Sequence, residues 1–434
     1  MKNRIVLGSA IGTVLGLVAL AATVTGAFAH SNGATPLPAS SCTAIQNPSG
    51  NLLIASDLPL QGAGRTQTIQ MAKMISFVFG QAGWKAGNYT IAYQSCDDST
   101  AQAGKWDSGK VSANANAYAS DPSVAGVIGT FNSGAAEIEV PVLNRAPNGP
   151  IAMVSPANTY VGLTTSGPGT AAGEPGKYYP TGKRNYARVV AADSYQGAAD
   201  AMLAKSLGIK KVFVLNDKEA YGAGVAGNFS AAARSLGITV ASNTAWDGKA
   251  TSYEALAVKI KASGATGVFL GGLICENGTK LIKDIAAGDP GIKILAPDGF
   301  TPVSAVVQGA GTAANNMTVS VAGVPNNKLP ASGQAFLKAF SKTIGGTSVD
   351  PYSVYAAQAA QLMLAAIASS DGTRAGVTKA LFKARVADGV LGKNFGVKPN
   401  GDVATGAVTI YKVVGGKQTT FKIITPPSSL VAIA

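Results

Sequence analysis

The feature that most constrains the fold is an alternation of short β-rich runs with helical patterns, which occurs twice along the chain. The runs of the first half are residues 52–55, 89–93, 125–128 and 150–154. Between the first two runs, Ala72, Ile75 and Phe79 recur at helical spacing and form one apolar face. This rhythm predicts a parallel sheet whose crossover helices cover its faces.

The same rhythm begins again after a Gly-, Pro- and Thr-rich stretch at residues 162–182. The runs that predict a second set of strands are residues 211–215, 238–241, 267–270 and 292–295. Helical patterns that end next to a Gly, as many helices do, cover residues 198–207, 225–236 and 253–262. Since 434 residues also exceed the usual size of one core, we predict an α/β protein with two lobes.

The end of the chain carries two more helical patterns, at residues 333–343 and 352–368, and a β-like run at residues 407–413. None of these segments has the size of a third domain. We expect them to return to the two lobes and complete them, so that several strands link the lobes and form a hinge.

The N-terminus has the three parts of a secretion signal. Lys2 and Arg4 precede an apolar run over residues 5–20, and residues 27–29 read Ala-Phe-Ala, a small-residue cleavage site. We predict cleavage before His30 and an exported protein that is periplasmic or associated with the outer cell surface. The alternative, a membrane anchor, is disfavoured because Ala, Gly and Thr make the run only weakly apolar.

The remaining composition excludes several functional classes. His30 is the only histidine, which argues against His-based triads, general bases and metal sites. The net charge falls from +13 to +11 without Lys2 and Arg4, and the other basic residues are scattered, which argues against nucleic-acid binding. We expect no metal, no cofactor and no catalytic centre, and no later stretch is apolar enough to span a membrane.

The cysteines fit an oxidising compartment. Cys42 and Cys96 flank early predicted strands, so we predict a disulfide between them and leave Cys275 free, without a role. Three unpaired thiols are the alternative. A lipid anchor at Cys42 is not favoured, because this residue lies well beyond the apolar run.

Ligands of open parallel sheets bind beyond the carboxyl ends of the strands, and four predicted loops there carry suitable residues. Ser133 opens a helix whose N-terminus favours an anion, and Thr159 offers a hydroxyl and a backbone N–H. In the second half, Tyr221 offers an aromatic cover and Asp298 a carboxylate for an ammonium group. The alternatives for these residues are helix caps and ordinary turns.

Two other functions are rejected. Gly222, Gly224 and Gly227 form a GxGxxG pattern, but they begin several residues after the predicted strand rather than in its turn, so we do not predict dinucleotide binding. A secreted hydrolase is disfavoured by the scarcity of histidine and by the lack of a GxSxG-like turn.

Taken in order, several segments resemble the leucine/isoleucine/valine-binding proteins, the periplasmic binding proteins of branched-chain amino-acid ABC importers. The segments are residues 55–62, 129–134, 155–164, 194–197, 217–222 and 297–299. The resemblance implies the type I periplasmic binding protein fold, with two Rossmann-like lobes built on parallel sheets and joined by three crossovers near Arg188, Ala322 and Asn394. It divides the chain into a signal peptide (1–29), an N-terminal extension (30–50), lobe 1 (51–188 and 322–394) and lobe 2 (189–321 and 395–434).

The resemblance also implies how an amino acid is held. Ser133 and the Thr159 N–H hold the α-carboxylate, while the Ala157 carbonyl, the Thr159 hydroxyl and Asp298 hold the α-ammonium. Tyr221 and Tyr352 occupy the positions of aromatic walls.

Further ligand contacts are expected from both lobes. Leu273 or Ile274 falls near the ligand side chain, for which an apolar pocket suits a branched or aromatic group. Arg65 and Gln67 lie in the loop after the first strand, where the family usually has an aromatic residue, and Arg65 fits an acidic or larger ligand.

The implied function is the substrate-binding protein of an ABC importer, a monomer without enzymatic activity. It captures an amino acid, branched-chain or otherwise apolar, and delivers it to a permease and ATPase complex. The alternative is the same fold binding an amide, a urea-like compound or an aromatic acid, or acting as a ligand sensor.

Overall fold

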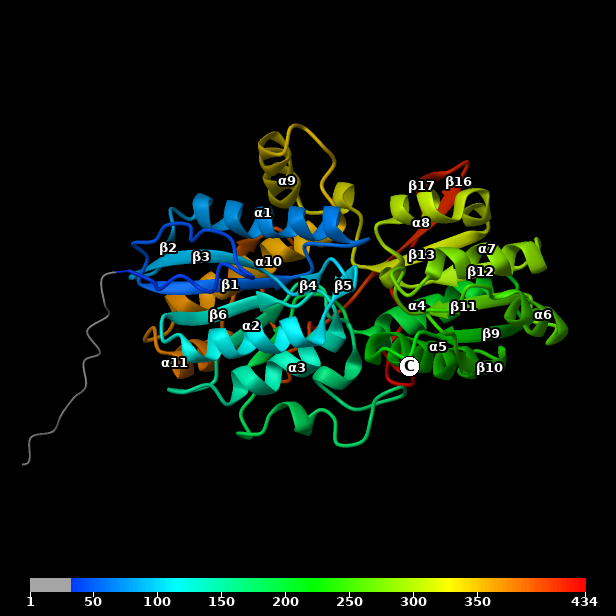
Figure 1. Cartoon of the computed structure of the whole chain (residues 1–434), viewed down its shortest axis with the longest axis horizontal. Helices are drawn as coiled ribbons and strands as arrows, with labels where there is room; N and C mark the ends of the chain where they lie inside the picture. The colour runs from blue at the N-terminus through cyan, green and yellow to red at the C-terminus, as the bar shows by residue number, and fades with distance from the viewer. Residues whose placement is uncertain (1–32) are drawn as a thin grey trace, which may run out of the picture. The chain divides into compact units, whose positions relative to one another are not determined.

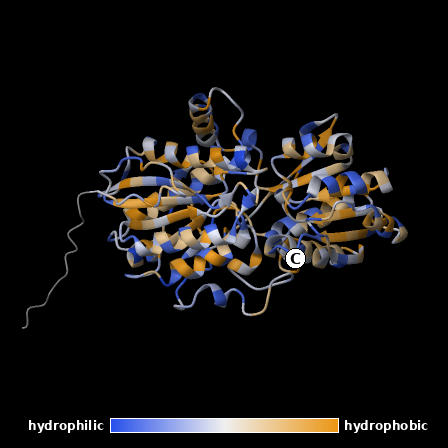
Figure 2. Ribbon diagram, viewed as in Figure 1, coloured by the Kyte–Doolittle hydropathy of each residue, from blue (hydrophilic) through white to orange (hydrophobic). Residues whose placement is uncertain are grey.

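Two β-sheets, each covered by helices, account for most of residues 33–434, the part of the chain that the computed structural model describes (Figure 1). The predicted signal peptide and His30 lie outside this part. The strands are largely hydrophobic where helices cover them, as Figure 2 shows. Burial of apolar side chains between sheet and helices is the main force that stabilises such a layered fold.

The first sheet has the strand order β2-β3-β1-β6-β7-β8. Its strands are β2 (Lys85–Ala86), β3 (Tyr89–Asp97), β1 (Leu52–Leu58), β6 (Val124–Gly129), β7 (Ala152–Ser155) and β8 (Tyr186–Arg188). All pairs are parallel except β2 with β3. Every residue of β1 is buried, as expected for a strand covered on both faces, and the four strands predicted in this half are confirmed.

Helices from both ends of the chain cover the first sheet. They are α1 (Arg65–Gln81), α2 (Ser108–Ser120), α3 (Ser133–Asn144), α9 (Ala331–Thr343), α10 (Pro351–Ala368) and α11 (Arg374–Leu381). Ile75 and Phe79 of α1 share a core with Tyr93 of β3 and Met363 of α10. The late helices α10 and α11 contact β6 and β7, so the end of the chain does return to the first sheet.

The segment after residue 33 lies along strand β3. Gln46 pairs with Tyr93, and Cys42 pairs with Cys96 in antiparallel bridges. Cys42 and Cys96, the predicted pair, form a disulfide, and Cys275 is a free cysteine. A sulfur in a disulfide has no valence left for a lipid thioether.

The second sheet has the order β10-β9-β11-β12-β13-β16-β17. Its strands are β10 (Thr239–Ala245), β9 (Lys211–Asn216), β11 (Gly267–Gly271), β12 (Lys293–Ala296), β13 (Met317–Ala322), β16 (Val408–Val414) and β17 (Lys417–Ile424). The first five are parallel, but β16 and β17 are antiparallel, so the expectation of a wholly parallel core needs correction. Gly415 and Gly416, both at positive φ, make the tight turn that an antiparallel hairpin requires.

The helices of the second sheet are α4 (Asp193–Ser206), α5 (Ala220–Ser235), α6 (Glu254–Ala262), α7 (Gly278–Gly288), α8 (Val303–Ala310) and the short α12 (Ser428–Val431). Phe229 of α5 stacks on Phe269 of β11 with ring centroids 4.1 Å apart. Two small hairpins complete the strands: β4 (Ser99–Thr100) with β5 (Lys105–Trp106), and β14 (Val386–Gly389) with β15 (Gly392–Phe395). No helix among residues 33–434 is long and apolar enough to cross a membrane.

The chain passes between the sheets at three places, which is the predicted hinge: from β8 to α4, from β13 to α9, and from β15 to β16. Arg188, at the first crossing, is fully buried and pairs with Asp402 of the third crossing, with Nε 2.9 Å from Oδ1. Its guanidinium also donates to the carbonyls of Asn158 and Tyr160. Arg188 thus ties the hinge to the loop that carries Thr159.

Candidate functional site

A small cavity lies where the strand ends of the two sheets face each other. Its volume is about 20 Å³, and it is lined by Phe131, Asn132, Ser133, Ala157, Thr159, Tyr221, Leu273, Asp298, Gly299 and Tyr352. The structure therefore brings together most of the predicted ligand contacts, from loops of both lobes. The predicted residues that it does not bring to this cavity are Arg65, Gln67 and Ile274.

On the first-lobe side of the cavity, two loops tied to each other lie beside Tyr352 of helix α10. Ser133 is the first residue of α3, directly after β6, and its Oγ accepts from the Tyr160 N–H at 3.3 Å. Asn158 Nδ2 donates to the carbonyls of Thr130 (2.9 Å) and Phe131 (3.0 Å). These bonds hold Ser133 and the neighbouring Thr159 in place before any ligand binds.

The second-lobe side is dominated by the buried carboxyl group of Asp298. This residue opens a short 3-10 turn, η3 (Asp298–Phe300), that follows β12. Its Oδ1 accepts from the Tyr221 hydroxyl at 2.6 Å, and its Oδ2 accepts from the Tyr352 hydroxyl. The Tyr221 hydroxyl in turn accepts from the Gly299 N–H at 3.0 Å.

Burial determines the protonation of this group. Burial raises the pKa of Asp298, although hydrogen bonds from the two tyrosines act in the opposite direction. Burial and the Asp298 charge raise the pKa values of Tyr221 and Tyr352 well above the usual value, so both remain donors. A ligand ammonium beside Asp298 would favour the ionised carboxylate.

Asp193 is a residue that sequence reasoning missed. It is fully buried at the first residue of α4, and its N–H donates to the Thr159 carbonyl at 2.8 Å. Neither carboxyl oxygen has a hydrogen-bond partner within residues 33–434. Burial, and then the charge of Asp298, raise the pKa of Asp193 well above its usual value. The sequence does carry a signal for this residue: it is an acidic residue at the start of a helix, directly after the first crossing between the lobes.

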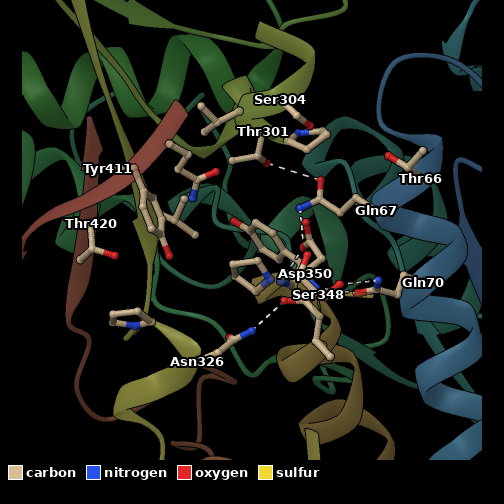
Figure 3. A pocket seen from close by; sticks show the side chains of 18 of the residues that line it. Thr66, Gln67, Gln70, Thr301, Ser304, Asn326, Ser348, Asp350, Tyr411 and Thr420 are labelled. Atoms are coloured by element: carbon tan, nitrogen blue, oxygen red, sulfur yellow. Dashed lines mark hydrogen bonds between the residues drawn. The ribbon is translucent and has the colours of Figure 1, made fainter. Parts of the chain in front are cut away.

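Arg65 and Gln67 belong to the first turn of helix α1 rather than to a loop, which corrects the sequence interpretation. Gln67 is buried, and Figure 3 shows it between Thr301 and Asp350: its Nε2 lies 2.8 Å from Asp350 Oδ1 and its Oε1 lies 3.4 Å from Thr301 Oγ. Arg65 is exposed and, with Ile274, lines a different cavity of about 530 Å³. Successive residues of a helix point in directions about 100° apart, so α1 cannot direct both side chains to one site.

Gln67 lines a cavity of about 600 Å³ that meets the small cavity only at Tyr352. Its walls are mainly hydroxyl and amide side chains, including Gln70, Ser304 and Thr420 (Figure 3). Its one carboxyl group, Asp350, already caps helix α10 by accepting from the Tyr352 N–H. The larger cavity therefore lacks the opposed charged and anion-binding groups of the smaller one.

The free cysteine and the acidic side chains of residues 33–434 form neither a reactive thiolate site nor a metal site. Burial raises the pKa of the Cys275 thiol to about 12, which disfavours the reactive thiolate. Among residues 33–434, no group of three or more His, Cys, Asp or Glu side chains is arranged to hold a metal ion.

Two α/β lobes joined by a three-crossover hinge, with facing polar groups at their strand ends, define a two-lobed solute-binding protein. Residues 54–418 match the family described as periplasmic binding protein, and the chain belongs to this family.

Among its relatives, the Leu/Ile/Val-binding protein homolog 3 of Brucella melitensis is 27% identical over 295 residues, 67% of this chain and 73% of the relative. An amino acid binding protein of Pseudomonas aeruginosa is 25% identical over 226 residues, 52% of this chain and 59% of the relative.

Solved structures share the fold at low identity. The leucine-binding protein LivK of Thermotoga maritima superposes with a TM-score of 0.74 at 19% identity, over 86% of this chain and 99% of that one. A solute-binding protein of R. palustris, in complex with benzoate, has a TM-score of 0.68 at 20% identity, over 86% of this chain and 96% of that one.

Proposed function

We propose that this protein is the extracytoplasmic substrate-binding component of an ABC importer and captures an amino acid between its two lobes. It then presents the closed form to a permease and ATPase complex. The names of its curated relatives, which include a Leu/Ile/Val-binding protein homologue and an amino acid binding protein, support this proposal.

The observation that carries the proposal is the placement of opposite chemistries across one cavity. Ser133, at the start of helix α3, and the Thr159 N–H suit a carboxylate, because a helix N-terminus favours negative charge. Asp298, on the facing lobe, suits an ammonium group. An α-amino acid carries both groups, and charge-assisted hydrogen bonds in a closed, dry site are strong.

The size of the cavity supports capture by lobe movement. About 20 Å³ is room for roughly one water molecule. An amino acid therefore enters when the lobes separate, and the lobes close over it around the three-strand hinge. Phe131, Leu273 and Tyr352 then offer apolar contacts, which fit a branched or other apolar side chain.

The experiment that tests the proposal is thermal unfolding of the protein against a panel of amino acids, amides and aromatic acids. Binding to the folded state raises the unfolding midpoint. We expect an increase of several degrees with leucine, isoleucine, valine or phenylalanine. Shifts with non-amino-acid ligands alone would overturn the proposed substrate.

The second candidate is an aromatic acid as ligand, because solved neighbours contain benzoate or, in Rhodopseudomonas palustris HaA2, p-hydroxybenzoic acid. These ligands carry a carboxylate without an ammonium group, so they would use Ser133 and Thr159 but not an ionised Asp298. The amide, urea-like and sensor alternatives likewise do not require Asp298. Ligand that is recovered unchanged after incubation agrees with a binding protein, whereas turnover would indicate an enzyme.

Export and a monomeric state belong to the same proposal. A disulfide between Cys42 and Cys96 suits an oxidising compartment outside the cytoplasm. Cell fractionation, together with N-terminal sequencing, tests whether the mature chain begins at His30. Light scattering tests whether the protein is a monomer in solution.

A further inference from the structure

The Gly-, Pro- and Thr-rich stretch at residues 162–182, here called the strap, is anchored in the first lobe by one buried carboxylate. Glu174 accepts from the hydroxyls of Tyr160 (2.7 Å) and Tyr178 (2.6 Å) and pairs with Lys177 at 2.8 Å. The Tyr178 hydroxyl oxygen also contacts the carboxyl group of Glu137 in helix α3. These contacts fix the base of the strap to the lobe that carries Ser133.

The tip of the strap is a tight turn over residues 167–170. The Thr170 N–H donates to the Gly167 carbonyl at 3.2 Å, and Gly169 has a φ of +78°. Pro168 followed by a glycine at positive φ is the usual composition of a type II turn. The tip thus has the local geometry of a turn that its own residues stabilise.

The tip packs on helix α5 of the second lobe, at two of the glycines in the GxGxxG pattern (Figure 1). A Cβ on Gly227 would lie 2.6 Å from Gly169 Cα, and a Cβ on Gly224 would lie 2.5 Å from the ring of Tyr160. The buried Asn228 donates from Nδ2 to the Pro168 carbonyl at 2.9 Å. The glycines thus allow a close approach between strap and helix that no larger residue permits.

The N-terminal end of the same helix is joined to the first lobe by an ion pair. Lys105 Nζ lies 2.8 Å from Glu219 Oε1, just before α5, and also contacts Glu276 of the second lobe. Tyr221, which donates to Asp298 in the ligand cavity, lies between Glu219 and Gly224 in the first turn of α5. Contacts to the first lobe therefore flank Tyr221 on both sides.

We propose that the strap is a closure device that docks on the Gly224–Gly227 face of α5, favours the closed form and positions Tyr221 over the ligand. This inference rests on the proposed function only where ligand affinity is concerned. It gives the strap and the glycine pattern one shared role: close packing between the lobes.

The test is Gly227→Ala, with Gly80→Ala as the matched control. Gly80 also lies in a helix, α1, but a Cβ there meets no atom within 4 Å. Alanine favours helix in both variants, so Gly80→Ala should not lower the thermal midpoint of the ligand-free protein, whereas in Gly227→Ala the clash with the strap opposes this gain. In Gly227→Ala the new methyl group forces the backbone of the strap away from α5. We expect leucine affinity to fall about tenfold in this variant only.

Small-angle scattering of the ligand-free proteins gives a readout that does not depend on the ligand. We expect a larger radius of gyration for Gly227→Ala than for wild type and Gly80→Ala. Equal radii and equal affinities in all three proteins would contradict the proposed role of the strap in closure. If wild type binds no amino acid, the proposed function fails. The scattering comparison still tests whether the strap favours the closed form. Asn228→Ala, which removes the hydrogen bond to Pro168, should shift both readouts in the same direction as Gly227→Ala.

Discussion

The two lobes present different chemistry to the cavity between them. The first lobe offers a helix N-terminus, hydroxyls and backbone groups from loops that Asn158 holds together. The second lobe offers one carboxyl group, Asp298, held by tyrosine hydroxyls. Backbone groups are set by the fold and suit any ligand with a carboxylate, whereas a single side chain can change without altering the fold. On the proposed function, the carboxyl group of the second lobe is therefore what distinguishes an amino acid from other carboxylates.

The lobes also differ in covalent stabilisation, because the disulfide of Cys42 and Cys96 lies in the first lobe. Replacing both residues by serine should cost about 4 kcal/mol of unfolding free energy for a loop with a sequence separation of 54. Denaturant unfolding of this variant, beside a Cys275→Ser control, measures the loss. An equal loss in the control would show that the disulfide has no special role.

The largest effect on binding should come from the second lobe. Asp298→Asn removes the charge that would pair with the ligand ammonium, and leucine affinity should fall about 100-fold, or about 2.7 kcal/mol. Asp289→Asn, at the end of helix α7 and outside the cavity, is the control and should leave binding unchanged. Calorimetric titration with leucine makes the comparison, and full affinity in Asp298→Asn would rule out the proposed ammonium site.

The first lobe contains a cluster of fully buried carboxyl groups: Asp57, Asp98 and Glu139. All oxygens of Asp98 and Glu139 lack a hydrogen-bond partner within residues 33–434. Burial raises the pKa of Asp57 to about 7 and those of the other two well above their usual values. The charge of Asp57 raises the pKa values of Asp98 and Glu139 further, and the charge of nearby Asp97 raises that of Asp57. Their neighbours are Tyr118, whose hydroxyl is buried, and Lys110, whose charge opposes the shift of Asp57.

These shifts predict a pH dependence of stability. A carboxyl group with a raised folded-state pKa keeps its proton in the folded protein at a pH where the unfolded chain has lost it. The raised pKa of Asp57 by itself should therefore increase the unfolding free energy, on the order of 2 kcal/mol, as pH falls from 8 to 5. Denaturant unfolding at several pH values measures this, and Asp57→Asn should flatten the curve. An unfolding free energy that increases with pH over this range would contradict the raised pKa values of the cluster.

Ser133→Ala tests the first-lobe face of the cavity. Loss of one hydroxyl to a ligand carboxylate should weaken binding about tenfold. The loss should be the same for leucine and for an acid without an ammonium group, since both carry the carboxylate. Titration with both ligands distinguishes this from Asp298→Asn, which should affect leucine alone.

The smallest effect concerns the pH dependence of binding. Ionised Asp298 is the form that pairs with an ammonium group, and burial raises its pKa above the usual value of about 4. Leucine affinity should therefore fall several-fold as pH is lowered, beginning at a higher pH than for an exposed Asp. Asp298→Asn should lack this dependence, and a wild-type affinity that is constant down to pH 4 would argue against an ionised Asp298 in the complex.

Much of the fold follows from the sequence because parallel strands and their crossover helices have separate periodicities. The strand that ends before Ser133 and the strand that ends before Asp298 were predicted from apolar runs alone, and position at a strand end identified both residues. The residues at which helices begin are harder to predict from the sequence. The resemblance assigns Arg65 and Gln67 to the loop after the first strand, yet helix α1 begins at Arg65.

The contacts between lobes could not be predicted from local patterns. Asp193 is buried against Thr159, two of the GxGxxG glycines contact the strap or its neighbour Tyr160, and Lys105 reaches Glu219 more than a hundred residues away.

The antiparallel pair β16 and β17 was missed in part because the exposed strand β17 has no apolar run. In each case tertiary packing, not local propensity, determines the structure.

The central claim is that Asp298 makes this an amino-acid site. The most direct test compares leucine with 4-methylpentanoate, the same molecule without its ammonium group, by calorimetric titration of wild type and Asp298→Asn. We expect wild type to prefer leucine by about 100-fold and Asp298→Asn to bind both ligands about equally. Equal binding of the two ligands by wild type would contradict the account and identify a site for carboxylic acids.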